Sequence, residues 1–217
     1  MISIIEHRAA GVSWRGDADN LDTLDGKDIG RVEAVPLHDA LTRTYDTDAH
    51  FACYHVMGAA ITPRLAKASE PTLLNQGQRL MFNVVAVDFD DPWAHKNEGE
   101  ASDAWRTDWH DKLWDIPWDC DEGMSWYDTR GGGRAVWQLA EPIEGGDRFE
   151  AFVWGLLCEL RRRGLDPDMH CKDWTRLYRL PHVVRGEHGP QEYEIGLASG
   201  GALSFIPPKP SIFAGIE

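Results

Sequence analysis

The clearest apolar run in the chain extends from Val84 to Val87 and is rich in β-branched side chains. A short continuous run of this kind predicts a buried strand. Asp88 and Asp90 follow it, and Pro92 cannot continue a hydrogen-bonded ladder, so the strand should end there. Because strand side chains alternate between faces, Asp88 and Asp90 are expected to project from one face at the rim of a sheet.

The clearest helical pattern covers residues 147–163. Arg161, Arg162 and Arg163 at its end suit the negative end of the helix dipole, and Gly164 is a typical C-terminal cap. The apolar residues of this segment form one stripe: Phe149, Phe152, Val153, Leu156, Leu157 and Leu160. This stripe predicts a helix that packs on a core.

Weaker patterns predict the remaining elements. Strands are expected over residues 2–5, 50–60, 123–127, 134–139 and 192–198, and helices over 36–45 and within 98–118. The other residues up to position 34 are expected to form loops, and the pattern of residues 65–78 is ambiguous. In the second helix Trp105, Trp109 and Leu113 recur at helical spacing, which favours packing over the alternative of base stacking. Strands and helices interleave irregularly, which favours an α+β fold over a doubly wound parallel sheet.

Composition limits the function classes. The 217 residues carry a net charge of −14, which argues against a surface coated in phosphate-binding lysines. Binding to nucleic acid would need a local basic patch or bridging metal ions. No run of about 18 apolar residues predicts a membrane span, and the N-terminus does not have the pattern of a signal peptide. The cysteines are scattered without a CxxC pair, which predicts reduced thiols and a cytoplasmic protein.

The carboxylates of Asp88 and Asp90 are the first candidate for chemistry. Two adjacent carboxylates repel each other unless a cation lies between them, and hard divalent cations such as Mg²⁺ favour carboxylate oxygens. The alternative is a solvated strand end followed by an acidic turn.

A second candidate is the stretch from Thr129 to Leu139. Its three glycines, which include Gly132 and Gly133, allow the backbone to approach a ligand and aim amide donors at an anion. Arg134 then begins a strand with a cation suited to phosphate. The alternative is a flexible hairpin turn.

The third candidate follows the predicted long helix. Asp166 or Asp168 precedes Arg176 and Arg179, which alternate with apolar residues in a segment that should pack and direct its arginines into a cleft. The alternative is that both arginines decorate the surface. His170 and Cys171 in the same segment have no spaced partners, so they are interpreted as structural rather than as metal ligands.

Together these features match the needs of two-metal phosphoryl transfer, in which carboxylates hold the ions and arginines neutralise phosphates. Their order resembles the archaeo-eukaryotic primase (AEP) superfamily, specifically the primase-polymerase domains of phages and plasmids. That family has an hhhDhD strand, an SxGxH-type turn and strand, and an acidic residue before an RLxRLP-like segment. The matching segments are 85–90, 129–142 and 168–181, and the likeness covers roughly residues 80–190.

The resemblance implies a fold and a division of the chain. The expected fold is an RRM-like antiparallel or mixed sheet beside an N-terminal α/β unit, with the active site in the cleft between them. Residues 1–205 would form the primase-polymerase domain, divided at about residue 80 into the N-terminal unit and the catalytic core at about 81–205. Residues 206–217 would begin a linker or tail, and a helicase module in the same or a partner chain is an expected partner.

The resemblance also implies roles for residues. Asp88, Asp90 and Asp168 would bind Mg²⁺ or Mn²⁺, with Asp166 as a competing choice for the third carboxylate. Arg176 and Arg179 would hold the triphosphate of a dNTP or rNTP, and Arg185 would add a phosphate contact.

The implied activity is DNA primase or polymerase activity on a DNA template and primer. Arg134 stands where the family usually has a histidine that touches the nucleotide. Arginine can hold phosphate but cannot act as a base near neutral pH. The alternatives are a replication-initiator module that binds DNA or nucleotide without synthesis, which the replaced histidine favours, and a metal-dependent nuclease or hydrolase.

Overall fold

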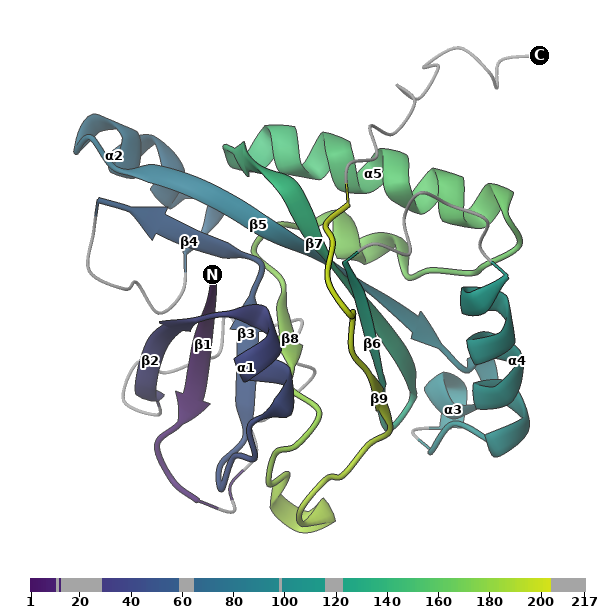
Figure 1. Ribbon diagram of the computed structural model, residues 1–217. Coiled ribbons are helices and arrows are strands. Elements are labelled where there is room, and N and C mark those ends of the chain that lie inside the picture. Colours follow the sequence, from purple (N-terminus) through teal and green to yellow (C-terminus); the bar gives the residue numbers. More distant parts are fainter. Residues whose placement is uncertain (11, 13–28, 59–64, 98, 116–122, 204–217) are drawn as a thin grey trace.

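The computed structural model describes residues 1–10, 12, 29–58, 65–97, 99–115 and 123–203. In this part of the chain nine strands form two sheets (Figure 1). The first sheet has the order β2 (Ile29–Val35), β1 (Ile2–His7), β3 (Ala49–Ala52) and β8 (Leu177–Arg179). The second has the order β4 (Tyr54–Met57), β5 (Arg79–Asp90), β7 (Gly132–Glu144), β6 (Met124–Asp128) and β9 (Ile195–Gly196). Every ladder between these strands is antiparallel, which confirms the α+β class.

The two sheets are not consecutive pieces of the chain. β4 lies before residue 80 but pairs with β5 in the second sheet, whereas β8 follows the long helix and pairs with β3 in the first. A boundary near residue 80 therefore does not divide the sheets, and β8 joins the C-terminal half of the chain to the N-terminal sheet. The expected linker at 206–217 lies outside the described residues.

The five described α-helices are α1 (Leu37–Thr42), α2 (Glu70–Asn75), α3 (Pro92–Asn97), α4 (Asp103–Trp114) and α5 (Gly146–Arg162). The described residues also include three short 3₁₀ helices, which are η3 (Lys67–Ser69), η4 (Met169–Lys172) and η5 (Gly186–His188). Helix α5 lies along the second sheet, where Phe149 stacks on Phe82 of β5 with ring centroids 4.0 Å apart (Figure 1). Its predicted stripe is buried except for the half-buried Phe152. Gly164 takes a φ of 88° just after the helix, as expected of a C-terminal cap.

The structure differs from the sequence-based expectation at several elements. β2 falls where loops were expected, because its pairing with β1 stabilises a segment with little apolar periodicity of its own. Residues 49–57 form two strands interrupted at Cys53, each belonging to a different sheet. The strand expected over 192–198 is reduced to Ile195–Gly196, which pairs with Trp126 and Tyr127.

The tryptophans of α4 pack as predicted. Trp109 and Leu113 are buried, and Trp105 stacks on Trp109 with centroids 5.9 Å apart. No helix in the described residues combines the length and apolar character needed to cross a membrane.

Candidate active site

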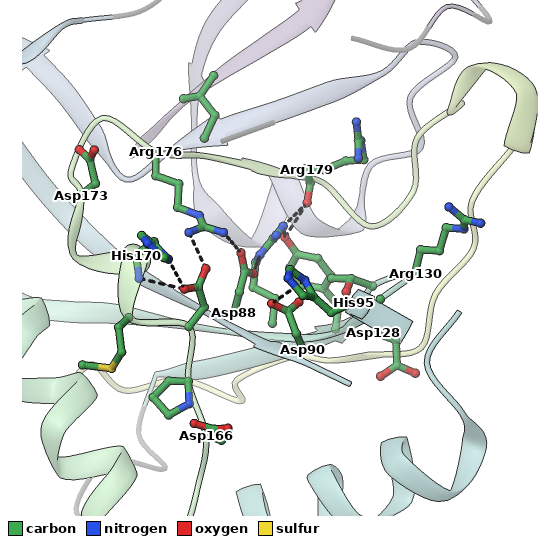
Figure 2. Close-up of a pocket in the computed structure, with 18 of the residues that line it drawn as sticks. Asp88, Asp90, His95, Asp128, Arg130, Asp166, His170, Asp173, Arg176 and Arg179 are labelled. Carbon is green, nitrogen blue, oxygen red and sulfur yellow. Dashed lines mark hydrogen bonds and ion pairs between the residues drawn. The ribbon is translucent and has the colours of Figure 1, made fainter. Parts of the chain in front are cut away.

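A cleft of about 1020 Å³ lies between the two sheets. Strand β5 and the β6–β7 turn of the second sheet line it, together with β8 of the first sheet and the segment between α5 and β8 (Figure 2). Seven of the predicted site residues line this cleft: Asp88, Asp90, Arg134, Asp168, Arg176, Arg179 and Arg185. The three candidate motifs, separate in sequence, are therefore brought to one place.

Backbone pairing explains why three carboxylates meet. Asp88 and Asp90 lie two residues apart on β5 and so share a face. The chain that leaves α5 then adds to the edge of β5: Phe89 forms a bridge with Pro167, and the Asp168 N–H donates to the Asp88 carbonyl at 2.8 Å. This pairing fixes Asp168 beside the aspartates of the strand.

Asp88 is buried and held by two arginines. Arg134 lies directly opposite Asp88 in the β5–β7 register, and its Nε donates to Asp88 Oδ1. Arg176 Nη2 donates to Asp88 Oδ2 at 3.1 Å. Each oxygen of the Asp88 carboxylate thus accepts from a guanidinium.

Arg134 is a fixed internal cation. Its Nη1 donates to the Tyr127 hydroxyl at 2.8 Å and to the Arg179 carbonyl at 2.6 Å, and its guanidinium carbon is 4.9 Å from the Tyr178 ring centroid. Burial alone would lower the pKa of Arg134, but Asp88 raises it well above the ordinary value, so the residue stays charged. Its predicted contact with a nucleotide remains a prediction; its described contacts are to the protein.

The structure distinguishes the two candidates for the third carboxylate. Asp168 Oδ2 accepts from Arg176 Nη1 at 2.7 Å, and its Oδ1 accepts from the His170 N–H at 2.9 Å. Burial would raise the pKa of Asp168, but these donors lower it. Asp166 instead lies at the rim, with 85% of its side chain exposed and Arg161 as its partner at 3.4 Å. Asp168, not Asp166, therefore belongs to the carboxylate cluster.

Asp90 differs from the other two carboxylates because, within the described residues, no arginine forms an ion pair with it. Its described ion-pair partner is His95 of α3, whose Nδ1 is 3.8 Å from Asp90 Oδ2 (Figure 2). Partial burial raises the pKa of Asp90 to about 6, and the negative charges of Asp88 and Asp168 add to that rise. Arg134 and Arg176, the two arginines paired with this cluster, therefore leave part of the negative charge of its three carboxylates uncompensated.

The donor chemistry of the cluster fits a hard divalent cation such as Mg²⁺ or Mn²⁺, because its members are all carboxylates and, in the part of the chain that the structure describes, no arginine pairs with Asp90. Among the described residues, however, no group of three His, Cys, Asp or Glu side chains is already arranged to hold a metal ion. Arg176 pairs with both Asp88 and Asp168 and so occupies an oxygen of each. By donor type, the three carboxylates suit the ion.

Arg179 has a partner that sequence reasoning missed. Its Nε and Nη2 donate to the two carboxylate oxygens of Asp48 at 2.9 and 3.1 Å, and Asp48 is completely buried. His50 lies opposite Arg179 in the β3–β8 register, and burial lowers its pKa to about 3, so it is neutral. Asp48 precedes a short strand without any motif, and only the pairing of β3 with β8 brings it to Arg179.

A second group of cations lines the far part of the cleft. Burial lowers the pKa of Arg185, and the like charges of Arg179 and Arg130 lower it further. Arg130 is 3.8 Å from the exposed carboxylate of Glu100. Sequence reasoning did not select Arg130, although its place within a glycine-rich turn was a usable signal. This part of the cleft favours an anion.

Helix α4 holds the turn that carries Arg130. Arg106 Nη2 donates to the Thr129 carbonyl at 2.8 Å and its Nη1 to the Gly132 carbonyl at 3.1 Å. His110 Nε2 lies 3.1 Å from Asp128 Oδ1 at the start of the same turn. These contacts make Arg106 a positioning residue for the turn.

Gly132 and Gly133 have a packing explanation. A Cβ on Gly132 would overlap the carbonyl oxygen of Phe89, and a Cβ on Gly133 would overlap the ring of Trp109. Both begin β7, and neither lines the cleft. Their predicted role in nucleotide binding stays a prediction, and close packing is reason enough for glycine at both positions.

The site thus defines a class: an α+β protein whose carboxylates and arginines line one cleft between two antiparallel sheets. No family model matches the chain, and no curated protein matches it by sequence. Among solved structures, the chain is similar to the AEP domain of the primase-polymerase of cyanophage S-2L, with a TM-score of 0.48 and 13% identity. The similarity covers 93% of this chain and 84% of that chain. It concerns the course of the backbone and not the chemistry of individual side chains.

Proposed function

We propose that the chain is a metal-dependent nucleotidyltransferase of the DNA primase-polymerase class. The observation that carries this proposal is the meeting of Asp88, Asp90 and Asp168 with a set of arginines in one cleft. A polyphosphate substrate needs this combination, because carboxylates attract divalent cations while guanidinium groups bind phosphate oxygens directly. The order of the motifs along the chain, which resembles that of primase-polymerases, supports the same class.

In this proposal the carboxylates and the arginines divide the work. Asp88, Asp90 and Asp168 would hold Mg²⁺ or Mn²⁺, which supplies positive charge to the attacking and leaving oxygens. Arg176 and Arg179, with Arg185 and Arg130, would hold the triphosphate of the incoming nucleotide. The 3′-oxygen of a primer forms a bond to the α-phosphorus, the bond from that phosphorus to the bridging oxygen breaks, and pyrophosphate leaves.

Arg134 would act through Asp88 and not as a base. Its raised pKa keeps the guanidinium protonated, so the proton of the 3′-hydroxyl has to pass to a carboxylate or to water. By pairing with Asp88 Oδ1, Arg134 fixes which oxygen of that carboxylate faces the cluster.

The test is primer extension and de novo priming on a DNA template, with Mg²⁺ and with Mn²⁺. Asp90→Asn is the informative variant, because Asp90 has no arginine partner in the described residues that its loss would leave unpaired. Extension by the wild type that disappears in Asp90→Asn is expected. Asp166→Asn is the matched control: it removes an aspartate from the rim of the same cleft and should retain extension.

A second candidate function is a nucleotide- or DNA-binding module without synthesis. One observation favours it: each oxygen of Asp88 accepts from an arginine, so this carboxylate is already neutralised. A folded wild type that binds nucleotide, loses that binding in Arg185→Gln and extends no primer with either metal would establish this candidate in place of the first.

A further inference from the structure

We infer that Arg176 competes with the divalent cation for Asp88 and Asp168, and that an anion in the cleft draws Arg176 away and so promotes cation binding. This inference rests on the proposed metal site and assigns Arg176 a role in coupling the two ligands. A single guanidinium bridges the two carboxylates, with Nη2 at 3.1 Å from Asp88 Oδ2 and Nη1 at 2.7 Å from Asp168 Oδ2 (Figure 2).

The two arginines on Asp88 take different oxygens. Arg134 donates to Asp88 Oδ1, and also to the Tyr127 hydroxyl and to the Arg179 carbonyl. Both guanidinium groups lie over the Tyr178 ring, with their carbons 4.9 Å (Arg134) and 5.7 Å (Arg176) from its centroid. Arg176 donates to Oδ2 of both Asp88 and Asp168, so a cation held between these two carboxylates has to replace Arg176 and not Arg134.

A bound anion offers Arg176 an alternative partner. Arg176 and the cations Arg130 and Arg185 line the same cleft, so a phosphate placed there can accept from the guanidinium. Once Arg176 has moved, Arg134 is the arginine that still pairs with the cluster of Asp88, Asp90 and Asp168, so the net charge of the cluster is more negative. A cation then binds more tightly, and by linkage the cation favours the anion by the same factor.

The first test measures Mn²⁺ binding by electron paramagnetic resonance in the absence of nucleotide. Arg176→Gln should bind Mn²⁺ more tightly than the wild type, by roughly tenfold, within the range of about 5- to 150-fold typical of coupled sites. Arg185→Gln is the control, because it removes one positive charge from the same cleft without an ion pair to these carboxylates. Arg176→Lys, which keeps the charge, should gain less than Arg176→Gln.

The second test compares two anions and takes its main result from the wild type, so it is informative even if Arg176→Gln does not fold. Sodium sulfate, compared with sodium chloride at equal ionic strength, should tighten Mn²⁺ binding to the wild type and leave Arg176→Gln unchanged. Sulfate that merely complexes Mn²⁺ in solution would weaken the apparent binding, so a gain cannot arise from that effect.

The outcomes separate this inference from the proposed function. Equal gains in Arg176→Gln and Arg185→Gln would mean that general electrostatics, not competition, sets the affinity. A wild type that binds Mn²⁺ as tightly as Arg176→Gln, without response to sulfate, would overturn the competition and leave the metal site standing. If neither protein binds Mn²⁺ at millimolar concentrations, the proposed metal-dependent activity fails and the inference fails with it.

Discussion

Replacing Asp48 by Asn tests whether a buried carboxylate in the first sheet positions an arginine of the cleft. Asp48 is completely buried and makes a two-pronged ion pair with Arg179 at 2.9 and 3.1 Å. Asparagine keeps the volume but removes the charge, so the guanidinium of Arg179 stays partly buried without a counter-ion. We expect lower stability and weaker nucleotide binding, because the Arg179 side chain is no longer fixed.

The size of the effect follows from burial. Breaking a buried ion pair by removing one partner costs about 3–5 kcal/mol. Because 18% of the Arg179 side chain remains exposed, water can solvate part of its charge, so we expect about 3 kcal/mol. For a chain of this length that corresponds to a fall in Tm of roughly 6–12 °C.

The assay is urea denaturation followed by tryptophan fluorescence, with thermal unfolding as a second probe. Asp166→Asn, whose side chain is 85% exposed, should stay within about 0.5 kcal/mol of the wild type. The double variant Asp48→Asn/Arg179→Met should be more stable than Asp48→Asn alone, because it removes the unpaired charge. A cost below about 1 kcal/mol for Asp48→Asn, as for an exposed pair, would refute this reasoning. The reasoning would also be refuted if the double variant lost as much free energy of unfolding as the two single variants lose together.

Three further changes give distinct outcomes. The pKa of Asp90 is raised from 3.8 to about 6, so its charged form destabilises the fold: stability should rise as pH falls from 7 through 6 towards 4. Asp90→Asn should be more stable than the wild type at pH 7 and lose that pH dependence in urea titrations; an unchanged slope would contradict the assignment. Gly132→Ala should unfold at a lower urea concentration than the wild type, because a Cβ would overlap the Phe89 carbonyl. Gly131→Ala, with open space around the Cβ position, should leave the unfolding midpoint unchanged. Equal midpoints for the two variants would contradict the packing explanation. Hydrogen bonds from Arg162 lower the pKa of Glu159 from 4.5 to about 2, so the charged carboxylate stabilises the fold. This contribution to the free energy of unfolding is present above pH 4.5 and is lost as pH falls towards 2. Glu159→Gln should therefore be less stable at neutral pH, with a difference that narrows in acid; a gap that stays constant from pH 7 to pH 3 would exclude this pair as its source.

Features that depend on near neighbours along the chain could be predicted from the amino-acid sequence. The apolar run from Val84 to Val87 predicted β5, and strand alternation predicted that Asp88 and Asp90 would share a face. The stripe on residues 147–163 predicted α5 almost to its ends, and Gly164 predicted its termination. Periodicity and capping are properties of a few consecutive residues, so they can be read without knowing what the segment packs against.

The pairing of charged side chains could not be predicted in this way, because it depends on how distant segments pack. The β5–β7 register places Arg134 opposite Asp88, 46 residues away, and this pairing has no signal in the local sequence. Asp48 meets Arg179 across 131 residues because β8 returns to the N-terminal sheet. A backbone hydrogen bond from the Asp168 N–H to the Asp88 carbonyl places Asp168 beside Asp88, whereas the Asp166 side chain lies exposed at the rim. Strand register and sheet order arise from contacts between distant segments, and a shift of one residue along a strand such as β7 would turn its side chains, Arg134 among them, to the other face.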